Sequence, residues 1–170
     1  GDTFDAVVLA CPSWDAARLV RDNAVDAPAW LALAEGLRHL PIATVYARSP
    51  RGLERPMVAL PGGPAQFVFD RGRLGGSEGL LAFVASASAG DREAVQAGVL
   101  AQAAALGWDG LQVLRTVVER RATFACTPGL AHPGIAVAGG LWACGDWVEG
   151  PYPATLEGAV RSGLAAARAL

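Results

Sequence analysis

The chain of 170 residues contains no lysine, and all 14 of its basic residues are arginines. Without an amine side chain, a Schiff-base lysine and a Walker-type phosphate loop are both excluded. The formal net charge is only −2 and the arginines are scattered, so no surface for nucleic acid is expected. Histidine is also scarce, and neither His39 nor His132 has a serine or cysteine partner nearby in the sequence, which disfavours nucleophilic catalysis.

Cysteine is scarce too, and the three that occur lie far apart. Cys11, Cys126 and Cys144 form no Cys-x-x-Cys pair and have no histidine at ligand spacing, so we expect no metal site. Three cysteines do not indicate a secreted disulfide framework, and we interpret Cys126 and Cys144 as small buried hydrophobic residues. The longest apolar stretch, residues 134–145, is too short to span a bilayer, and we expect no signal peptide.

More than half of the residues, 52%, are hydrophobic, which is enough for a buried core in roughly one domain. Residues 5–10 form a continuous apolar run, which is typical of a strand buried on both faces in a parallel sheet. Ser13 is expected to cap a helix over residues 14–22. A second helix should follow Pro28 and end near Leu40.

The middle of the chain changes character. Runs of β-branched and aromatic residues predict strands over 42–48, 57–60, 66–70 and 80–86. Turn residues separate them, which indicates an antiparallel meander; the Gly75-Gly76 pair is typical of a hairpin turn rather than a phosphate loop, because no helix follows it. Asp91 should then cap a helix that ends near Leu106, and residues 111–121 alternate like an edge strand or one with a polar face.

The carboxy-terminal segment combines a buried strand that ends in Gly145-Asp146, a proline-rich loop and a helix that begins near Ala154. The glycine lets a ligand approach the backbone, and the Asp146 carboxylate can accept hydrogen bonds from ribose or ribityl hydroxyls. The free N–H groups of residues 155–157 can face a pyrimidine carbonyl or a negative charge. An ordinary strand-to-loop turn and tight helix–sheet packing are the alternatives.

Small residues make one smooth face of this last helix, and Leu156, Val160 and Leu164 make a second, apolar face. Its two interior glycines, Gly158 and Gly163, each cost about 1 kcal/mol relative to alanine. Close approach to a sheet or to a flat ligand would offset this cost. Together with the Gly-Asp strand end, the helix favours a cofactor site.

The segment Gly140–Leu170 resembles the carboxy-terminal flavin motif of the amine oxidase and phytoene desaturase superfamily. Within that superfamily, the chain resembles squalene-associated FAD-dependent desaturases, also called hydroxysqualene dehydroxylases, over nearly its whole length. Residues 152–163 carry this resemblance most specifically. The other segments that carry it are 5–14, 41–46, 66–72 and 121–129.

The resemblance implies a set of residues that contact FAD, namely Ala10, Cys11, Pro12, Gly145, Asp146, Thr155 and Leu156. Asp146 would lie beside the ribityl and pyrophosphate groups, and the backbone at 155–156 would lie near the flavin ring. Residues 10–12 would lie where the first strand returns toward the cofactor. Trp147 and Tyr152 either line the passage to the ring or pack beneath the loop. No catalytic side chain follows from the sequence.

The chain departs from the superfamily pattern in two places. True amine oxidases flank the substrate amine with aromatic residues, one at the position of Thr155 and one close to Ala122, so an apolar isoprenoid is the expected substrate instead. The Gly-x-Gly-x-x-Gly segment that binds the ADP half of FAD is absent. The chain therefore looks like the carboxy-terminal portion of a longer enzyme, and we expect it to be inactive alone and to bind FAD weakly or not at all.

We expect an α/β fold, with α+β as the alternative. Residues 1–12 and 140–170 would be parts of a Rossmann-like FAD-binding domain whose N-terminal dinucleotide-binding half is missing. Residues 13–139 would form a substrate-binding domain with a mixed or antiparallel sheet and helices. Because the first strand would expose an unpaired edge, we also expect a homo-oligomer or association with the missing N-terminal part.

The expected parent is an FAD-dependent oxidoreductase that acts on a squalene-type isoprenoid in hopanoid synthesis. The resemblance implies a bacterial, cytoplasmic enzyme and leaves room for peripheral membrane contact. The alternatives are a fragment of a carotenoid or phytoene desaturase, a fragment of an amine oxidase, or a lipid-binding module without catalysis.

Overall fold

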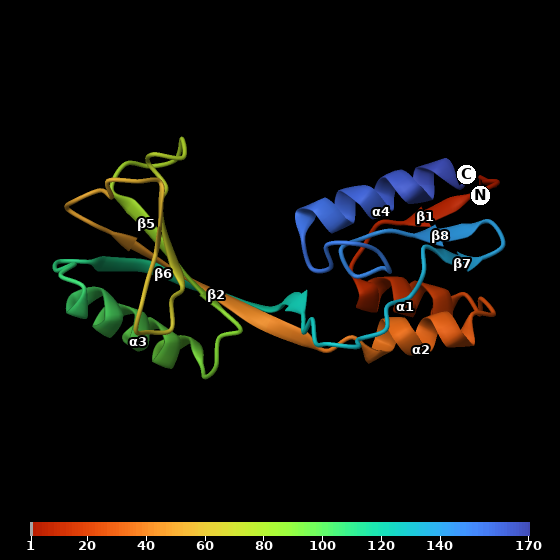
Figure 1. The fold of residues 1–170 in the computed structure, drawn as a ribbon, viewed down its shortest axis with the longest axis horizontal. Coiled ribbons are helices and arrows are strands. Elements are labelled where there is room, and N and C mark those ends of the chain that lie inside the picture. The colour runs from red at the N-terminus through yellow and green to blue at the C-terminus, as the bar shows by residue number, and fades with distance from the viewer. Residues whose placement is uncertain (1) are drawn as a thin grey trace. The chain divides into compact units, whose positions relative to one another are not determined.

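The structure is a computed structural model that describes residues 2–170, and it divides into two compact units with separate hydrophobic cores. Unit 1 comprises the chain up to Arg38 together with Phe124–Leu170, and unit 2 comprises His39–Thr123 (Figure 1). Each unit combines a sheet with one or more helices, which confirms the predicted α/β class. The predicted domain boundaries at 12/13 and 139/140 fall inside unit 1, and Gly1 lies outside the described residues. Which unit binds which ligand stays a prediction.

A three-stranded sheet organises unit 1, in the order β1 (Val7–Leu9), β8 (Leu141–Ala143) and β7 (Ala136–Ala138). β1 runs parallel to β8, with Leu9 opposite Ala143, whereas β7 pairs antiparallel with β8. The strand predicted over 5–10 is therefore present. It is not buried on both faces as predicted, because β1 lies at the edge of the sheet and Val7 is 45% exposed.

Three helices cover the sheet of unit 1: α1 (Ser13–Asp22) and α2 (Pro28–Gly36) lie on one face and α4 (Leu156–Arg168) on the other (Figure 1). Ser13 lies inside the first turn of α1 rather than at its cap, which Pro12 occupies. α2 ends at Gly36 instead of near Leu40, and His39 begins a strand. Leu37, the residue after the helix, is already extended, and Pro41 keeps the backbone of Leu40 out of the helical region, because a proline disfavours helical backbone in the residue before it.

Unit 2 is built on a five-stranded sheet in the order β3-β4-β5-β2-β6. The strands are β2 (His39–Arg48), β3 (Met57–Ala59), β4 (Phe67–Asp70), β5 (Leu80–Ser86) and β6 (Gln112–Phe124). β3, β4 and β5 pair antiparallel in succession, which confirms the predicted meander, and β2 pairs antiparallel with β5. β6 lies at the edge of the sheet, which is one of the two alternatives predicted for the strand over 111–121; the other was a strand with one polar face.

The helix α3 (Arg92–Ala105) packs its apolar residues Val95, Val99 and Ala103 into the core of unit 2. Asp91 caps it as predicted, accepting a hydrogen bond from the Ala94 N–H at 2.8 Å. On the same helix, the buried Gln102 side chain accepts from Ala65 N–H at 3.0 Å and donates to Ala65 O at 2.9 Å. The helix therefore holds the loop before β4 through a polar clamp as well as through apolar packing.

Candidate functional site

The parallel pairing of β1 and β8 brings two of the predicted cofactor-binding segments together at the carboxyl ends of these strands, which we call the flavin edge. The Cys144 N–H donates to Leu9 O at 3.0 Å, so residues 10–12 and 145–146 leave the sheet side by side. The Trp147 indole N–H then donates to Cys11 O at 3.1 Å and joins the two segments beyond the strands. In open α/β sheets, ligands bind outside the carboxyl ends of the parallel strands, which is where these residues lie.

The third predicted segment, the start of α4, lies beside Asp146. The Ala154 N–H donates to Asp146 O at 3.1 Å, and Thr155 forms the N-cap of the helix. The Thr155 hydroxyl donates to Tyr152 O at 2.6 Å and accepts from the Gly158 N–H at 3.1 Å. All seven residues predicted to contact FAD therefore lie at the flavin edge. Their contact with a flavin stays a prediction.

The strand end at Gly145 is tied firmly to α4. The Gly145 N–H donates to the Ser162 hydroxyl at 2.9 Å, and the same hydroxyl lies 2.9 Å from Gly145 O and 2.8 Å from Ala159 O. A Cβ at position 145 would collide with the Trp147 indole, so only glycine fits here. Ser162 was not predicted in this role, because its sequence position marks it only as one of the small residues of the helix.

The Asp146 carboxylate lines a pocket of about 100 Å³ together with Glu149, Arg161 and Ser162. Within residues 2–170, no hydrogen bond or ion pair engages this carboxylate, so its oxygens are available to hydroxyl donors. An acceptor of this kind suits the hydroxyls of a ribityl chain, the group that the sequence predicts beside Asp146. The volume is well below the roughly 300–1,000 Å³ of pockets for larger ligands, so this edge would hold only part of that cofactor.

The aromatic residues after Asp146 differ in their environment. Trp147 is 4% exposed and meets Trp30 edge-to-face, with ring centroids 5.8 Å apart, so it packs in the core of unit 1. Tyr152 is 54% exposed, and the Arg161 guanidinium lies 5.2 Å from its ring centroid. Trp147 therefore has a structural role, whereas Tyr152 is available at the surface of the loop.

The three cysteines differ in their surroundings. Burial, and then the nearby Asp15 carboxylate, raise the pKa of the Cys11 thiol, and burial raises the pKa of the Cys144 thiol. Both stay neutral thiols at physiological pH, which suits small apolar residues. The interpretation of Cys126 as buried is wrong: this residue is exposed in the irregular segment after β6, where no packed element covers it.

Residues 2–170 contain neither a metal-binding cluster nor a membrane-spanning helix. No group of three metal-ligating side chains lies close enough together to hold a metal ion. None of the helices in this range combines the length and hydropathy needed to cross a membrane. His132 is engaged in packing: its Nδ1 lies 3.0 Å from Trp147 O, and its ring meets Phe124 edge-to-face at 5.2 Å.

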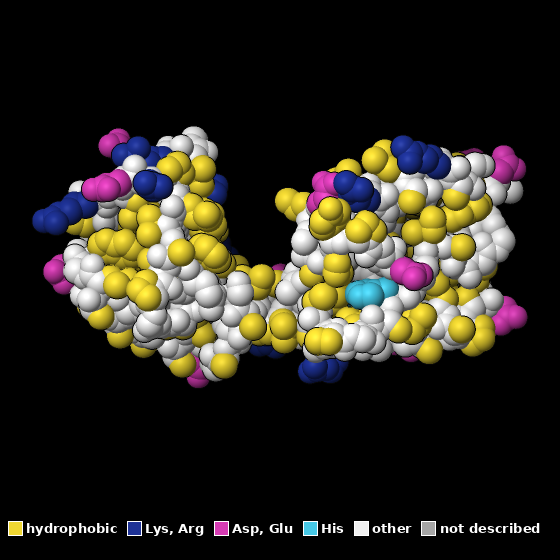
Figure 2. All heavy atoms as spheres, viewed as in Figure 1, with side chains coloured by type: hydrophobic (Ala, Val, Ile, Leu, Met, Phe, Trp, Pro, Cys, Tyr) yellow, Lys and Arg dark blue, Asp and Glu magenta, His cyan; other side chains and the backbone are white. Residues whose placement is uncertain are grey.

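The two faces predicted for α4 have different environments. Gly158, Ser162 and Ala166 on the small face are buried. The apolar face is open: Leu156 is 88% exposed, Val160 59% and Leu164 52%. Figure 2 shows apolar side chains next to charged ones on the side of unit 1 where α4 lies. An exposed apolar row of this kind marks an interaction surface more often than an ordinary helix face does.

Known proteins resemble this chain at the levels of family, sequence and fold. A family model described as flavin containing amine oxidoreductase matches residues 1–170. Hydroxysqualene dehydroxylases from Rhodopseudomonas palustris and Sinorhizobium fredii are 50% and 48% identical over 54 residues, which is 30% of this chain and 13% of each relative. The crystal structure of an oxidoreductase from Methanosarcina mazei superposes with a TM-score of 0.73 at 14% identity, over 98% of this chain and 43% of that one.

Proposed function

Because the chain belongs to the family of flavin containing amine oxidoreductases, we propose that it is part of an FAD-dependent oxidoreductase that acts on a squalene-type isoprenoid. The observation that carries the proposal is the shared edge of β1, β8 and α4, where three separate segments place a free carboxylate, a glycine and a helix start together. The names of the two bacterial relatives support the choice of substrate. The same resemblance supports a role in hopanoid synthesis in a bacterial cytoplasm.

In this proposal, the chain contributes the ribityl and ring side of the cofactor site. FAD, when bound, supplies the redox chemistry of the reaction. Asp146 accepts hydrogen bonds from ribityl hydroxyls, and the first turn of α4 presents its N–H groups and its positive dipole end to the ring. Gly145 keeps the backbone free of a side chain at the point of closest approach.

The rest of the enzyme would cover the surfaces that unit 1 leaves open. β1 lies at the edge of its sheet, and Phe4 just before it is 74% exposed. With the apolar row of α4, this edge suits pairing with the dinucleotide-binding part of the parent enzyme or with a second copy of the chain. An isoprenoid substrate would also bring the parent enzyme to a membrane surface, which we propose as a peripheral contact.

Cofactor binding is the first test of the proposed function. We expect the separate chain to bind FAD weakly, in equilibrium dialysis followed by flavin absorbance, and the complete enzyme to hold FAD stoichiometrically. In the complete enzyme, Asp146→Asn should lower the affinity for FAD by about tenfold or more, because a charge-assisted hydrogen bond is lost. Asp109→Asn, an exposed substitution in unit 2, is the control and should leave the affinity unchanged. Stoichiometric flavin in both variants with equal affinity would overturn the assignment of Asp146.

Substrate conversion by the complete enzyme is the second test. We expect mass spectrometry to show loss of hydroxysqualene in the presence of the complete enzyme and a reductant, and no conversion of primary amines. Conversion of amines would favour an amine oxidase. Flavin-free protein that extracts isoprenoid without converting it would favour a lipid-binding module.

A further inference from the structure

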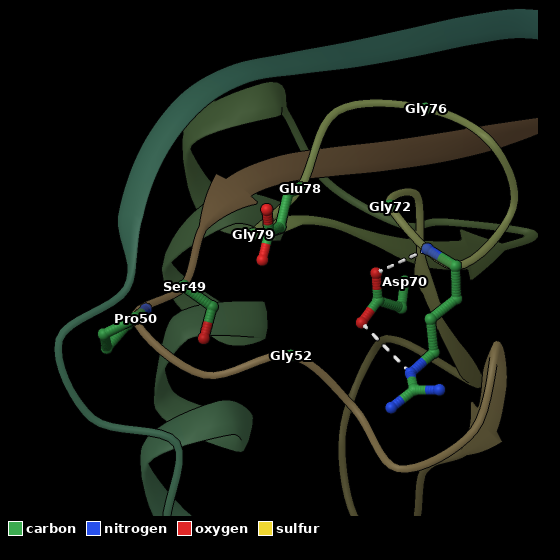
Figure 3. A pocket seen from close by; sticks show the side chains of 9 residues that line it. Ser49, Pro50, Gly52, Asp70, Gly72, Gly76, Glu78 and Gly79 are labelled. Carbon is green, nitrogen blue, oxygen red and sulfur yellow. Dashed lines mark hydrogen bonds and ion pairs between the residues drawn. The ribbon is translucent and has the colours of Figure 1, made fainter.

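A second cavity lies in unit 2, whereas the residues of the predicted flavin site belong to unit 1. It has a volume of about 520 Å³ and lies between the connection from β2 to β3 and the hairpin from β4 to β5 (Figure 3). Backbone forms much of its wall, since four of its lining residues are glycines. The Gly75-Gly76 pair predicted a hairpin turn here, and no local pattern of the sequence indicated a cavity.

Asp70, at the end of β4, holds the two walls together. It is only 4% exposed, and its carboxylate accepts hydrogen bonds from Leu53 N–H at 2.9 Å and Arg73 N–H at 3.2 Å. The Arg73 Nε donates to Leu53 O at 2.6 Å and lies 3.9 Å from the Asp70 carboxylate. A Cβ at Gly52 would come within 2.9 Å of the same carboxylate. Asp70 is therefore committed to the structure of the cavity and is not its free binding group.

Two opposite charges in the cavity wall remain free. The terminal nitrogens of Arg73, whose side chain is 52% exposed, make no hydrogen bond within residues 2–170. The Glu78 carboxylate likewise has neither a hydrogen bond nor an ion pair to any of these residues, and the two side chains do not pair with each other. Figure 3 shows the Glu78 carboxylate directed into the space beside Ser49 and Gly52, and Arg73 lines the same cavity.

A ligand that matches both charges must itself carry two. The planar guanidinium binds the oxygens of a phosphate or carboxylate in pairs, and a carboxylate attracts an ammonium group. Residues 48–79 carry five arginines against three carboxylates, which favours the higher charge of a phosphate. The volume is in the range of pockets for small molecules. A bare anion would leave Glu78 unmatched, and a bare amine would leave Arg73 unmatched.

We propose that this cavity binds a small zwitterion that joins a phosphate to an ammonium group, with Arg73 on the phosphate and Glu78 on the ammonium. An aminoalkyl phosphate and the headgroup of an aminophospholipid share this chemistry. Leu74, 49% exposed on the same hairpin, gives the surface beside the cavity an apolar side chain that a lipid would contact. This proposal does not depend on the flavin site in unit 1.

Titration calorimetry with O-phosphoethanolamine tests the proposal on the chain as it is. We expect saturable binding, and affinities for inorganic phosphate and for ethanolamine that are each about tenfold lower or more. Glu78→Gln should lower the affinity for O-phosphoethanolamine by about tenfold and leave the affinity for inorganic phosphate unchanged. Arg73→Gln should lower both affinities. Glu54→Gln and Arg55→Gln are exposed controls on the connection from β2 to β3 that do not line the cavity, and both variants should bind as the unmodified chain does.

The variants also separate binding from folding. Arg73→Gln removes the hydrogen bond to Leu53 O and can loosen the cavity, so its thermal unfolding is measured in parallel. Glu78→Gln removes no contact within residues 2–170, so its effect reports on the ligand alone. No saturable binding of O-phosphoethanolamine, equal affinity for phosphate, or binding indifferent to Glu78→Gln would each overturn the proposal.

Sedimentation with vesicles distinguishes the two sources of the ligand. Vesicles of phosphatidylethanolamine mixed with phosphatidylcholine are compared with vesicles of phosphatidylcholine alone. If the chain sediments more with the vesicles that contain phosphatidylethanolamine, and Glu78→Gln abolishes this increase, the ligand is a lipid headgroup. Binding of free O-phosphoethanolamine without such sedimentation supports a soluble metabolite.

Discussion

Gly158 and Gly163 occupy the same helix and differ in what surrounds them. A Cβ at Gly158 would collide with the carbonyl oxygen of Tyr152, whereas a Cβ at Gly163 would meet nothing within 4 Å. We predict that Gly158→Ala destabilises the chain by roughly 1–3 kcal/mol, because the loop before α4 must move. Gly163→Ala should instead stabilise it by about 0.5–1 kcal/mol. Urea unfolding of both variants checks this, and equal effects would show that the helix approaches nothing closely at Gly158.

Asp70 makes the stability of the chain depend on pH. The Leu53 N–H, then the Arg73 and Gly72 N–H groups and the Arg73 guanidinium, hold the pKa of Asp70 below its ordinary value against the opposing effect of burial. The carboxylate therefore contributes stability at all pH values above about 4, the ordinary value for an aspartate, and this contribution is lost as the pH falls through the lower folded pKa.

The substitution Asp70→Asn measures that contribution. We predict a loss of roughly 1–3 kcal/mol at pH 7, because charge-assisted hydrogen bonds to the loop are weakened. The difference from the unmodified chain should shrink as the pH is lowered below 4. Denaturant unfolding across this pH range is the measurement, with Asp109→Asn as an exposed control. A difference that stays constant with pH would mean that the charge of Asp70 contributes nothing.

At the scale of elements, the apolar row on α4 carries the next prediction. Because Leu156, Val160 and Leu164 are exposed in this chain, the double substitution Val160→Gln and Leu164→Gln should change its unfolding free energy by less than about 1 kcal/mol. The same change should weaken association with the rest of the enzyme or with a second copy. Light scattering and co-purification with the dinucleotide-binding part measure this. The opposite outcome, a large loss of stability with association intact, would place the row inside a core.

The elements that the sequence predicted well are those whose determinants are local. The meander from β3 to β5 follows from turn residues between alternating strands, and the Asp91 cap follows from a single side chain. The end predicted for α2, near Leu40, was wrong because the apolar spacing continues past Gly36 into β2. The edge position of β1 depends on which strands are its neighbours, and no local pattern encodes that. Likewise, the cavity at Asp70 needs two loops that lie about twenty residues apart in the chain.

At the scale of the whole molecule, the two cores predict separate folding. Unit 2 is one continuous segment, His39–Thr123, with a core of its own. We predict that this segment expressed alone unfolds cooperatively in urea, with near-ultraviolet circular dichroism from Trp108 packed against Phe83 at 5.7 Å. A segment without fixed aromatic packing would show that unit 2 needs the remainder of the chain.

Unit 1 is interrupted in sequence, yet its two pieces meet at a hydrogen bond: the Ala125 N–H donates to Arg38 O at 2.7 Å. The ends left by removing residues 39–123 would thus lie close enough to be joined by a linker of a few residues. Unit 2 is therefore inserted between two segments of unit 1 that hydrogen-bond to each other. In evolution, an insert at this junction can change in length or be exchanged without altering the path of the chain through the core of unit 1.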